Sequence, residues 1–401
     1  MSDSATNPQA SSYRYIIGAL AATSFLMAFI SRFAWPPMVQ VMLPIMDITR
    51  TEAMAYMSVF YIGYVATQIP GGILGDRFGP RIVLSVAMAL QGLGTLGLGM
   101  TSDYQVGFAL RLLCGLGAGC VYSCCLKSVV TWFSPAQRGL AIGILMSAPP
   151  LGIAIPNLIM PRLNNAIGWA NSFMAVGIVI LIFSVLVLTM MKEVKTTQAG
   201  PRKSIMVGLK YVFSNRNILL VSLAGFSLIW CQMGFGSVGN LYMTEHLGFS
   251  NVDAGDVMSA FGIMGLFSAA VAGWLCGKFP SGKKWMIVMC HILMIVFLLM
   301  FGQLTTLTAC MAMAVVLGLL FGFANPIYSV VIAESAGPEW AATAGGLGNA
   351  IFQVAAILSP MALGIARDAT NGFGYTWYIL AAGAVFGIVM ALGLTHKPAE
   401  A

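Results

Sequence analysis

The chain has 401 residues, of which 59% are hydrophobic and only 8% are charged, and its mean hydropathy is +0.87. Soluble domains carry about 25% charged residues, so this composition excludes a water-soluble globule and predicts a polytopic membrane protein. The formal net charge of +7 does not indicate nucleic-acid binding, because the basic residues are scattered over short segments between apolar runs.

Apolar runs of about 20 residues, the length that spans a bilayer as a helix, recur twelve times along the chain. They fall near residues 14–44, 52–75, 81–100, 104–133, 139–162, 168–191, 217–243, 252–276, 285–302, 305–333, 341–366 and 373–394. With the N-terminus inside, the cytoplasmic segments hold fourteen Lys and Arg residues, and the outside segments hold only Arg50, Arg162 and Arg367. This asymmetry satisfies the positive-inside rule. We therefore expect a multi-pass protein of a bacterial inner membrane with both termini in the cytoplasm.

The chain is expected to consist of two similar halves. Gly115 and Gly119 recur as Gly318 and Gly322 at an offset of 203 residues, and Gly72 recurs as Gly273 at an offset of 201. Repetition at a fixed offset indicates two copies of one structural unit. The predicted divisions are a cytoplasmic tail (1–13), a six-helix half (14–191), a cytoplasmic linker (192–216), a second six-helix half (217–394) and a tail (395–401). The predicted fold class is an all-α membrane protein of about twelve transmembrane helices in two pseudo-symmetric halves.

A charged, glycine-rich hairpin separates the second and third runs and reads Gly-Gly-Ile-Leu-Gly-Asp-Arg-Phe-Gly-Pro-Arg over residues 71–81. Its form resembles the loop between the second and third helices of the major facilitator superfamily of transporters. The resemblance implies a substrate site between the two halves, alternating access, and a latch that closes the cytoplasmic side. The latch residues are expected to be Gly72, Asp76, Arg77, Gly79, Arg81 and Arg138.

Asp76 is the only carboxylate of this hairpin, and the second copy of the hairpin has a glycine in its place. We expect Asp76 either to cap the start of the helix near residues 341–343 or to pair with Arg138. No duplicate carboxylate contact is expected in the second half. The alternative is that the loop serves only membrane topology.

Two arginines fall inside predicted spans, Arg32 in the first and Arg111 in the fourth. A guanidinium at membrane depth costs on the order of 3 kcal/mol, so it needs a protein or aqueous surrounding and usually an anionic partner. Asp and Glu residues are all expected at helix ends or in loops, so the counter-ion of Arg32 is expected to be an anionic substrate. Arg111 either contacts the substrate or braces its helix. Lys127 lies about 160° from Arg111 around the same helix and is expected to snorkel to the cytoplasmic end.

The first 170 residues show a narrower resemblance. Arg32, the pair Gly63–Tyr64, the run 68–72, Arg111 and the segment 132–139 together look like the anion:cation symporter branch, which carries sugar acids and other organic anions. Many members have carboxylates where this chain has Ser31 and Ala118, and those carboxylates are implicated in proton coupling. We therefore expect exchange, facilitated diffusion or sodium-linked transport.

Polar side chains complete the predicted site. Tyr122 shares a helix face with Arg111, Asn325 repeats the position of Tyr122, and Asn349 and Gln353 lie four residues apart on one face. These amides alternatively bridge helices. The predicted substrate contacts are Arg32, Tyr64, Arg111, Tyr122, Asn325, Asn349 and Gln353.

The favoured function is transport of a small organic anion, most simply a carboxylate, by alternating access. The alternatives are a multidrug or metabolite efflux antiporter, which the Gly143–Gly152 segment faintly resembles, and a sensor that keeps the transporter fold. The expected partners are the anion, a co-transported or exchanged ion and the lipid bilayer, with a functional monomer. The sequence shows no catalytic constellation, nucleotide loop or metal-ligand set, so we expect no enzyme activity, no cofactor, no metal and no nucleic acid. The eight cysteines are expected to be buried hydrophobic residues.

Overall fold

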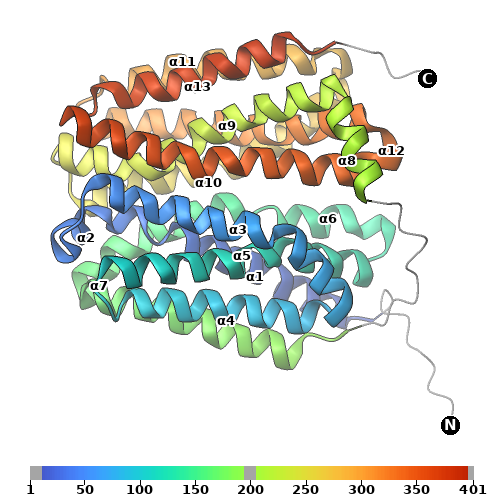
Figure 1. The fold of residues 1–401 in the computed structure, drawn as a ribbon, viewed down its shortest axis with the longest axis horizontal. Helices are drawn as coiled ribbons and strands as arrows, with labels where there is room; N and C mark the ends of the chain where they lie inside the picture. Colours follow the sequence, from blue (N-terminus) through green and yellow to red (C-terminus); the bar gives the residue numbers. More distant parts are fainter. Residues whose placement is uncertain (1–10, 194–204, 396–401) are drawn as a thin grey trace. The chain divides into compact units, whose positions relative to one another are not determined.

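The computed structural model describes residues 11–193 and 205–395, and every regular element in these ranges is a helix (Figure 1). The elements are α1 (Tyr13–Phe33), η1 (Pro36–Met38), α2 (Val39–Met46), α3 (Arg50–Phe78), α4 (Pro80–Leu98), α5 (Tyr104–Trp132), α6 (Pro135–Leu145), α7 (Ala148–Met190), α8 (Ile205–Ser214), α9 (Arg216–Leu241), η2 (Tyr242–His246), α10 (Asn251–Lys278), η3 (Pro280–Gly282), α11 (Lys283–Phe301), α12 (Leu307–Thr370) and α13 (Gly374–Leu392). Most of each predicted tail, and residues 194–204 of the predicted linker, lie outside the described residues.

Eleven stretches of the described chain are long and apolar enough to cross a membrane. One of them, Gln137–Met190, contains two of the predicted runs, because α7 is interrupted at Gly168. The twelve apolar runs are thus all helical, and the predicted all-α membrane fold is confirmed.

Two glycines reverse the chain inside segments that otherwise remain helical. Gly168 in α7 has a φ of 82° and Gly337 in α12 has a φ of 70°. Residues with a Cβ rarely adopt such positive values, whereas glycine adopts them at little cost. Each of these long elements is therefore two consecutive membrane-length helices.

The charged stretch 71–81 differs from the expected hairpin loop. Helix α3 continues through it to Phe78 and α4 begins at Pro80, so Gly79, with a φ of 84°, is the only residue between them. Helix α3 extends past the end of its apolar run. It ends before Gly79 because Pro80 has no backbone N–H donor and disfavours a helical conformation in the residue that precedes it. The predicted linker likewise contains a helix, α8.

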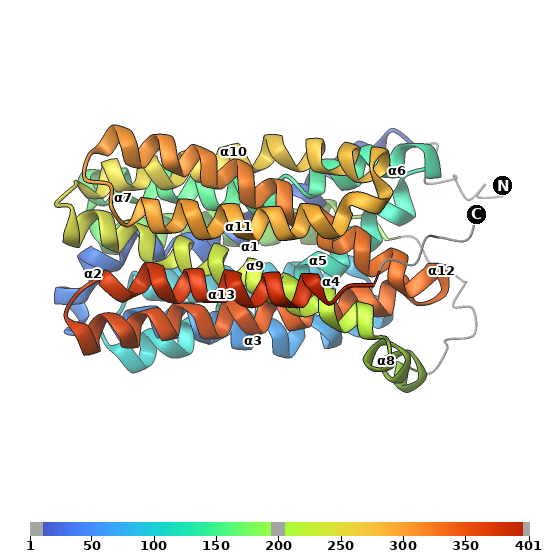
Figure 2. The same cartoon turned by 90° about the horizontal axis from the view of Figure 1, so that it is seen from above.

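Backbone contacts divide the chain into two compact units, residues 1–41 with 59–199 and residues 42–58 with 200–401. In the first unit α4 packs against α5 and α7, and α1 packs against the same two helices, all running side by side (Figures 1 and 2). In the second unit α12 packs against α9 and α10, while α11 packs against α13 and α12. Residues 42–58 belong to the unit of the later helices, although the sequence repeat assigns them to the first half.

The glycines of the predicted repeat make the same contact in both units. A Cβ added at Gly115 or Gly119 of α5 would overlap the carbonyl oxygen of Phe60 or Tyr64 on α3. A Cβ at Gly318 or Gly322 of α12 would overlap the carbonyl oxygens of Phe261 and Gly265 on α10, which lie 201 residues after Phe60 and Tyr64. Small residues let helix backbones approach closely in membranes, so the repeated glycines mark an equivalent helix crossing in each unit.

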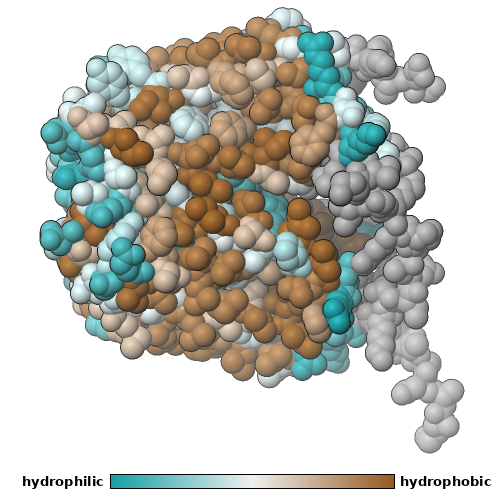
Figure 3. All heavy atoms as spheres, in the orientation of Figure 1, coloured by the Kyte–Doolittle hydropathy of each residue, from teal (hydrophilic) through white to brown (hydrophobic). Residues whose placement is uncertain are grey.

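The outer face of the helices is apolar. Leu140, Ile182 and Tyr378 are among many large hydrophobic side chains that are more than half exposed. Figure 3 shows hydrophobic residues over the middle of the helices and hydrophilic residues gathered towards their ends. Such a surface is suited to contact with lipid.

Candidate functional site

Arg32 lies in the last turn of α1, surrounded by aromatic rings of the first unit. Its guanidinium carbon is 4.4 Å from the ring centre of Phe29 on the same helix. The rings of three α3 residues lie 4.7–5.2 Å away: Phe60, Tyr61 and Tyr64. The residue is only 4% exposed. We call these four rings the aromatic cage.

The charge of Arg32 is balanced by ring faces rather than by an acid. Among the described residues no carboxylate forms an ion pair with it, and its Nε is buried without a hydrogen-bond partner. A cation–π contact contributes about 0.5–2 kcal/mol. Several such contacts offset much of the cost of burial, and the unpartnered Nε belongs to the planar fork of donors that matches a carboxylate or sulfonate.

Arg111 points its guanidinium at the end of α1. Its two terminal nitrogens donate to the carbonyl oxygens of Ser31 and Arg32, each at 3.0 Å, and the residue is 1% exposed. The donors of Arg111 thus hold the backbone of Arg32 in place. Of the two roles expected for Arg111, these contacts favour the brace.

Two further contacts fix the position of α1. The hydroxyl of Ser31 lies 2.9 Å from that of Thr95 on α4, so it links the end of α1 to α4. A Cβ at Gly152 of α7 would overlap the Cβ of Phe29, so this glycine allows α7 to approach the cage.

The structure brings Arg32, Tyr64 and Arg111 together and connects Tyr122 to them through an aromatic row. The ring of Tyr122 lies 5.4 Å from that of Phe25, which lies 5.1 Å from that of Phe29. Phe60 and Tyr61 of the cage were not predicted. Their only signal was an aromatic-rich run before Tyr64, because the rotation of α3 is not visible in the sequence.

The amides predicted for the site lie in the second unit. Asn325 Nδ2 donates to Gln232 Oε1 of α9 at 3.2 Å, and Gln353 Nε2 donates to Asn349 Oδ1 at 3.4 Å. Gln232 was missed, although it is an amide in the middle of an apolar helix. The first of these bonds bridges two helices, which is the alternative that the sequence left open. A substrate contact by these amides stays a prediction.

Asp76 has a partner that the sequence did not identify. Lys127 Nζ on α5 lies 3.0 Å from Asp76 Oδ1 and 2.9 Å from the carbonyl oxygen of Gly75. Arg138, the expected partner, instead donates its Nε to the carbonyl oxygen of Phe133. The pairing with Arg138 is therefore wrong, and Lys127 reaches the end of α3 as an ion-pair partner. The expected contact near residues 341–343, where the side chains of Ala341 and Ala342 lie outside the described residues, stays a prediction.

The other latch residues secure the junction of α3, α4 and α7. Arg81 Nε donates to the carbonyl oxygen of Leu188 at 2.6 Å, and its backbone N–H donates to Glu193 Oε1 at 3.2 Å. A Cβ at Gly79 would overlap the carboxylate of Glu193, which the sequence did not assign to the latch. Arg77 lies over the ring of Phe78, and a Cβ at Gly72 would make only an ordinary contact with Ser123.

The second unit has a carboxylate contact of its own. Lys283 at the start of α11 forms an ion pair with Glu334 of α12, and Lys283 is only 6% exposed. The second hairpin has no carboxylate of its own, so this ion pair differs from the Asp76 contact: it joins α11 to an acid of α12.

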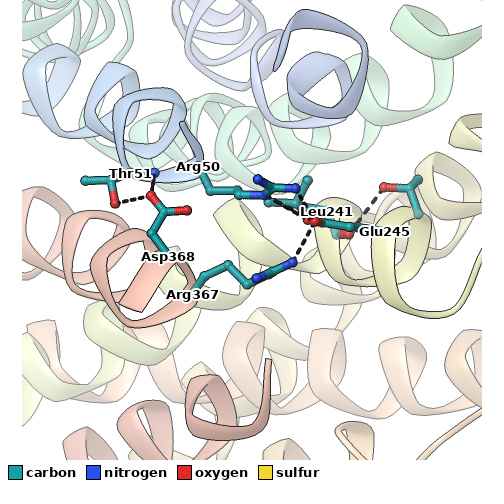
Figure 4. Close-up of polar contacts among 7 residues, drawn as sticks. Arg50, Thr51, Leu241, Glu245, Arg367 and Asp368 are labelled. Atoms are coloured by element: carbon teal, nitrogen blue, oxygen red, sulfur yellow. Dashed lines mark hydrogen bonds and ion pairs between the residues drawn. The ribbon is translucent and has the colours of Figure 1, made fainter. Parts of the chain in front are cut away.

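A cluster of charges in the second unit was also missed (Figure 4). Glu245 accepts from Arg50 Nε at 3.1 Å and from an Arg367 terminal nitrogen at 2.7 Å. Asp368 accepts from the backbone N–H and the hydroxyl of Thr51 at 2.8 and 2.6 Å, and thereby caps the start of α3. We call these five residues the Glu245 cluster. The sequence assigned Arg50 and Arg367 to outside segments, but it gave no sign that they share one acid.

Neighbouring bonds hold the start of α3 in the same unit. The hydroxyl of Ser58 donates to the carbonyl oxygen of Ile357 at 2.6 Å. Thr49 and Glu52 bond each other in the reciprocal pattern of a capping box. The segment 42–58 is therefore attached to η2 and α12 by both charged and neutral contacts.

Among the described residues, the cysteines and the other side chains that can bind metal are not grouped into a metal site. The eight cysteines are buried and free. Within the described ranges, no three His, Cys, Asp or Glu side chains are grouped so that they could hold a metal ion.

The helical fold, with its many membrane-length stretches, defines an integral multi-pass membrane protein. The family model of the Major Facilitator Superfamily matches residues 20–360, so the chain belongs to that superfamily of transporters.

Relatives and solved structures agree with this membership. The chain is 25% identical over 360 residues to a hexuronate transporter of Bacillus subtilis strain 168, with 85% of each chain covered. It is 25% identical over 408 residues to a probable sulfoacetate transporter of Cupriavidus necator, covering 96% of this chain and 94% of the relative. A crystal structure of a bacterial homologue of the human lysosomal transporter Spinster, inward-facing and occupied, matches with a TM-score of 0.81 at 14% identity over 96% of both chains. The resemblance to the anion:cation symporter branch agrees with the first two relatives.

Proposed function

We propose that this protein carries a small organic anion across the membrane by alternating access, and that Arg32 binds the anionic group. The observation that carries the proposal is a buried guanidinium that no acid of the described chain neutralises. The relatives named for hexuronate and sulfoacetate support an anionic substrate, since each of these compounds carries a carboxylate or a sulfonate.

The cage suits such a ligand in two ways. The guanidinium presents parallel donors to a planar or tetrahedral oxyanion, with Arg111 holding the backbone behind it. The ring faces of Phe29 and Tyr64 exclude water, which strengthens the ion pair. The amides of Asn325, Asn349 and Gln353 are proposed to contact the uncharged part of the substrate.

The mode of energy coupling follows from the same surroundings. Many branch members carry acids at the positions of Ser31 and Ala118. Here neither residue is titratable: Ser31 bonds Thr95, and Ala118 is buried. We propose exchange, facilitated diffusion or sodium-linked transport rather than proton symport. Measurable alkalinisation outside proteoliposomes in fixed ratio to substrate uptake would contradict this.

The proposed setting is a plasma membrane with both termini in the cytoplasm. It is supported by the excess of Lys and Arg in segments on that side. On this assignment the Glu245 cluster lies at the outer end of the helices, and the Asp76–Lys127 pair lies at the cytoplasmic end.

The test is ligand binding to purified protein. Thermal shift and calorimetry with hexuronates, dicarboxylates, sulfonates, sugar phosphates, neutral sugars and a cationic drug separate anion carriage from efflux of cations. Arg32→Lys should weaken anion binding about tenfold to a hundredfold, the range expected for a lost charged hydrogen bond, and Arg32→Ala should abolish it. Arg162→Lys, at an exposed arginine whose Nη1 donates to the carbonyl oxygen of Leu158 in the same helix, serves as the control. Normal affinity in Arg32→Ala would overturn the proposal.

A further inference from the structure

The second unit has an apolar groove on the side of α10, α11 and α12, with a volume of about 770 Å³. It lies within the described part of this unit and contains none of the predicted substrate contacts. Its walls are Phe267 and Val271 of α10 and Met289 and Phe297 of α11, and Leu319 of α12 lies on its floor. Phe267, Val271 and Met289 are each more than half exposed, so the groove opens sideways.

The groove arises from the way the three helices pack. α10 packs closely against α12 where Gly318 and Gly322 allow contact with backbone atoms, and α11 packs against α12 and α13. α10 and α11 make few direct contacts with each other, although only the short turn η3 joins them. The two helices therefore diverge from the turn and leave a channel between them with α12 as its floor.

The length of the groove fits a hydrocarbon chain. It follows α11 from Trp285 to Phe297, about 18 Å at 1.5 Å per residue, which is more than half the thickness of a bilayer core. All but a few of its lining side chains are apolar, so it offers nothing to a polar solute along this length.

The end of the groove at the η3 turn is basic. Gly282 and Trp285 line it there, and Lys278, Lys283 and Lys284 lie in the same turn, while no Asp or Glu occurs between Asp256 and Glu334. Lys283 is engaged with Glu334, and Lys284 donates to two carbonyl oxygens at the end of α13. Lys278 is exposed and lies 4.9 Å from the ring centre of Trp274.

Exposed tryptophans mark this end as interfacial. Trp274 is 63% exposed and Trp285 is 62% exposed. Tryptophan is enriched at the level of lipid headgroups, and basic side chains there attract anionic headgroups at about 1 kcal/mol each. Trp285 lines this end of the groove, and Trp274 and Lys278 lie within three residues of the lining residue Leu275 on α10, so the groove and its end have the charge and polarity profile of one lipid molecule.

We propose that this groove is a binding site for an anionic phospholipid, with an acyl chain between α10 and α11 and the phosphate at Lys278. The site is separate from Arg32 and its cage, so it stands independently of the transported substrate. A lipid held there fills the space between α10 and α11 and stabilises the arrangement of α11 on α12.

The experiment measures lipid retention by native mass spectrometry of the delipidated full chain, titrated with phosphatidylglycerol and with phosphatidylcholine of the same acyl chains. The wild type should retain phosphatidylglycerol preferentially. Lys278→Gln should reduce that retention about fivefold, the change expected for one lysine at an anionic headgroup. Leu319→Trp, which fills the floor of the groove, should reduce retention of both lipids.

Lys210→Gln, at an exposed lysine of α8, is the matched control and should retain phosphatidylglycerol like the wild type. Thermal unfolding of each variant confirms that it is folded before lipid is added. Equal retention of the two lipids by the wild type, or an equal loss in Lys210→Gln and Lys278→Gln, would overturn the proposal.

Discussion

Arg32 and Arg111 are both almost fully buried, but their guanidinium groups face different surroundings. Arg32 lies among four aromatic rings and its Nε has no partner, whereas Arg111 lies 4.8 Å from the ring centre of Phe60 and donates to the carbonyl oxygens of Ser31 and Arg32. A charged side chain that bonds backbone oxygens fixes a helix end, whereas a buried donor without a partner can be offered to a ligand. The two residues are therefore expected to fail in different ways when they are replaced.

Arg111→Lys is expected to lower stability more than affinity. Lysine offers one point charge and cannot reproduce two parallel bonds to adjacent carbonyls, so the loss should be about 1–3 kcal/mol of stability. Thermal unfolding and anion affinity measured on the same preparations separate the two effects. Arg32→Lys should show the reverse pattern. A normal melting temperature combined with lost affinity in Arg111→Lys would assign that residue to the substrate instead.

The sequence predicted the positions of individual charges better than their partners. Arg32 was recognisable because a guanidinium inside an apolar run is costly wherever the helix points. Lys127 was placed correctly towards the end of its helix, but its ion pair with Asp76 depends on how α3 and α5 cross. Glu245 and Arg367 are 122 residues apart, so only the folded chain brings them together.

At the scale of the elements, the crossings of α5 with α3 and of α12 with α10 depend on the paired glycines. Gly115→Ala and Gly318→Ala should each destabilise the protein by about 1–3 kcal/mol, because a methyl group would overlap a carbonyl oxygen of the neighbouring helix. Gly143→Ala is the matched control, since nothing lies within 4 Å of its added Cβ. Thermal unfolding is the measurement, and equal stability of all three variants would contradict the close helix crossing.

Helix ends were predicted to within a few residues where an apolar run meets a charge or a capping residue, as at Asp103 before α5. They were not predicted where the helix outlasts its apolar run. Residues 71–78 are helical because their backbone hydrogen bonds continue in α3, and only Gly79 and Pro80 end them. Charge and glycine content therefore located this feature without revealing its conformation.

The Asp76–Lys127 pair is an element-scale latch between α3 and α5. Asp76→Asn should weaken this contact and raise the rate at which Cys124 is labelled by a maleimide from the cytoplasmic side, because Cys124 is buried beside Gly75. Glu334→Gln, which removes the ion pair with Lys283 in the second unit, should leave Cys124 labelling unchanged. A folded Asp76→Asn protein with the labelling rate of the wild type would remove this pair from the latch.

At the scale of the whole molecule, the segment 42–58 continues into the first unit at both of its ends but is attached to the helices of the second unit. In a carrier that works by alternating access, the contacts that close one face of the membrane must break while those that close the other face remain. Glu245 is suited to such a contact, because its carboxylate is only 15% exposed and serves both Arg50 and Arg367.

Glu245→Gln should release the start of α3. Arg50 and Arg367 would then lose the acid that they share, and the weaker attraction would favour separation of the segment from η2 and α12. With Ser58→Cys as the reporter, labelling by a membrane-impermeant maleimide from the outside should rise several-fold in the Glu245→Gln background. Asp253→Asn, whose carboxylate bonds only to the nearby Ser250 cap among the contacts shown, is the control and should not change the rate. If Ser58→Cys is labelled at the same rate with and without Glu245→Gln, the Glu245 cluster does not control opening at this end.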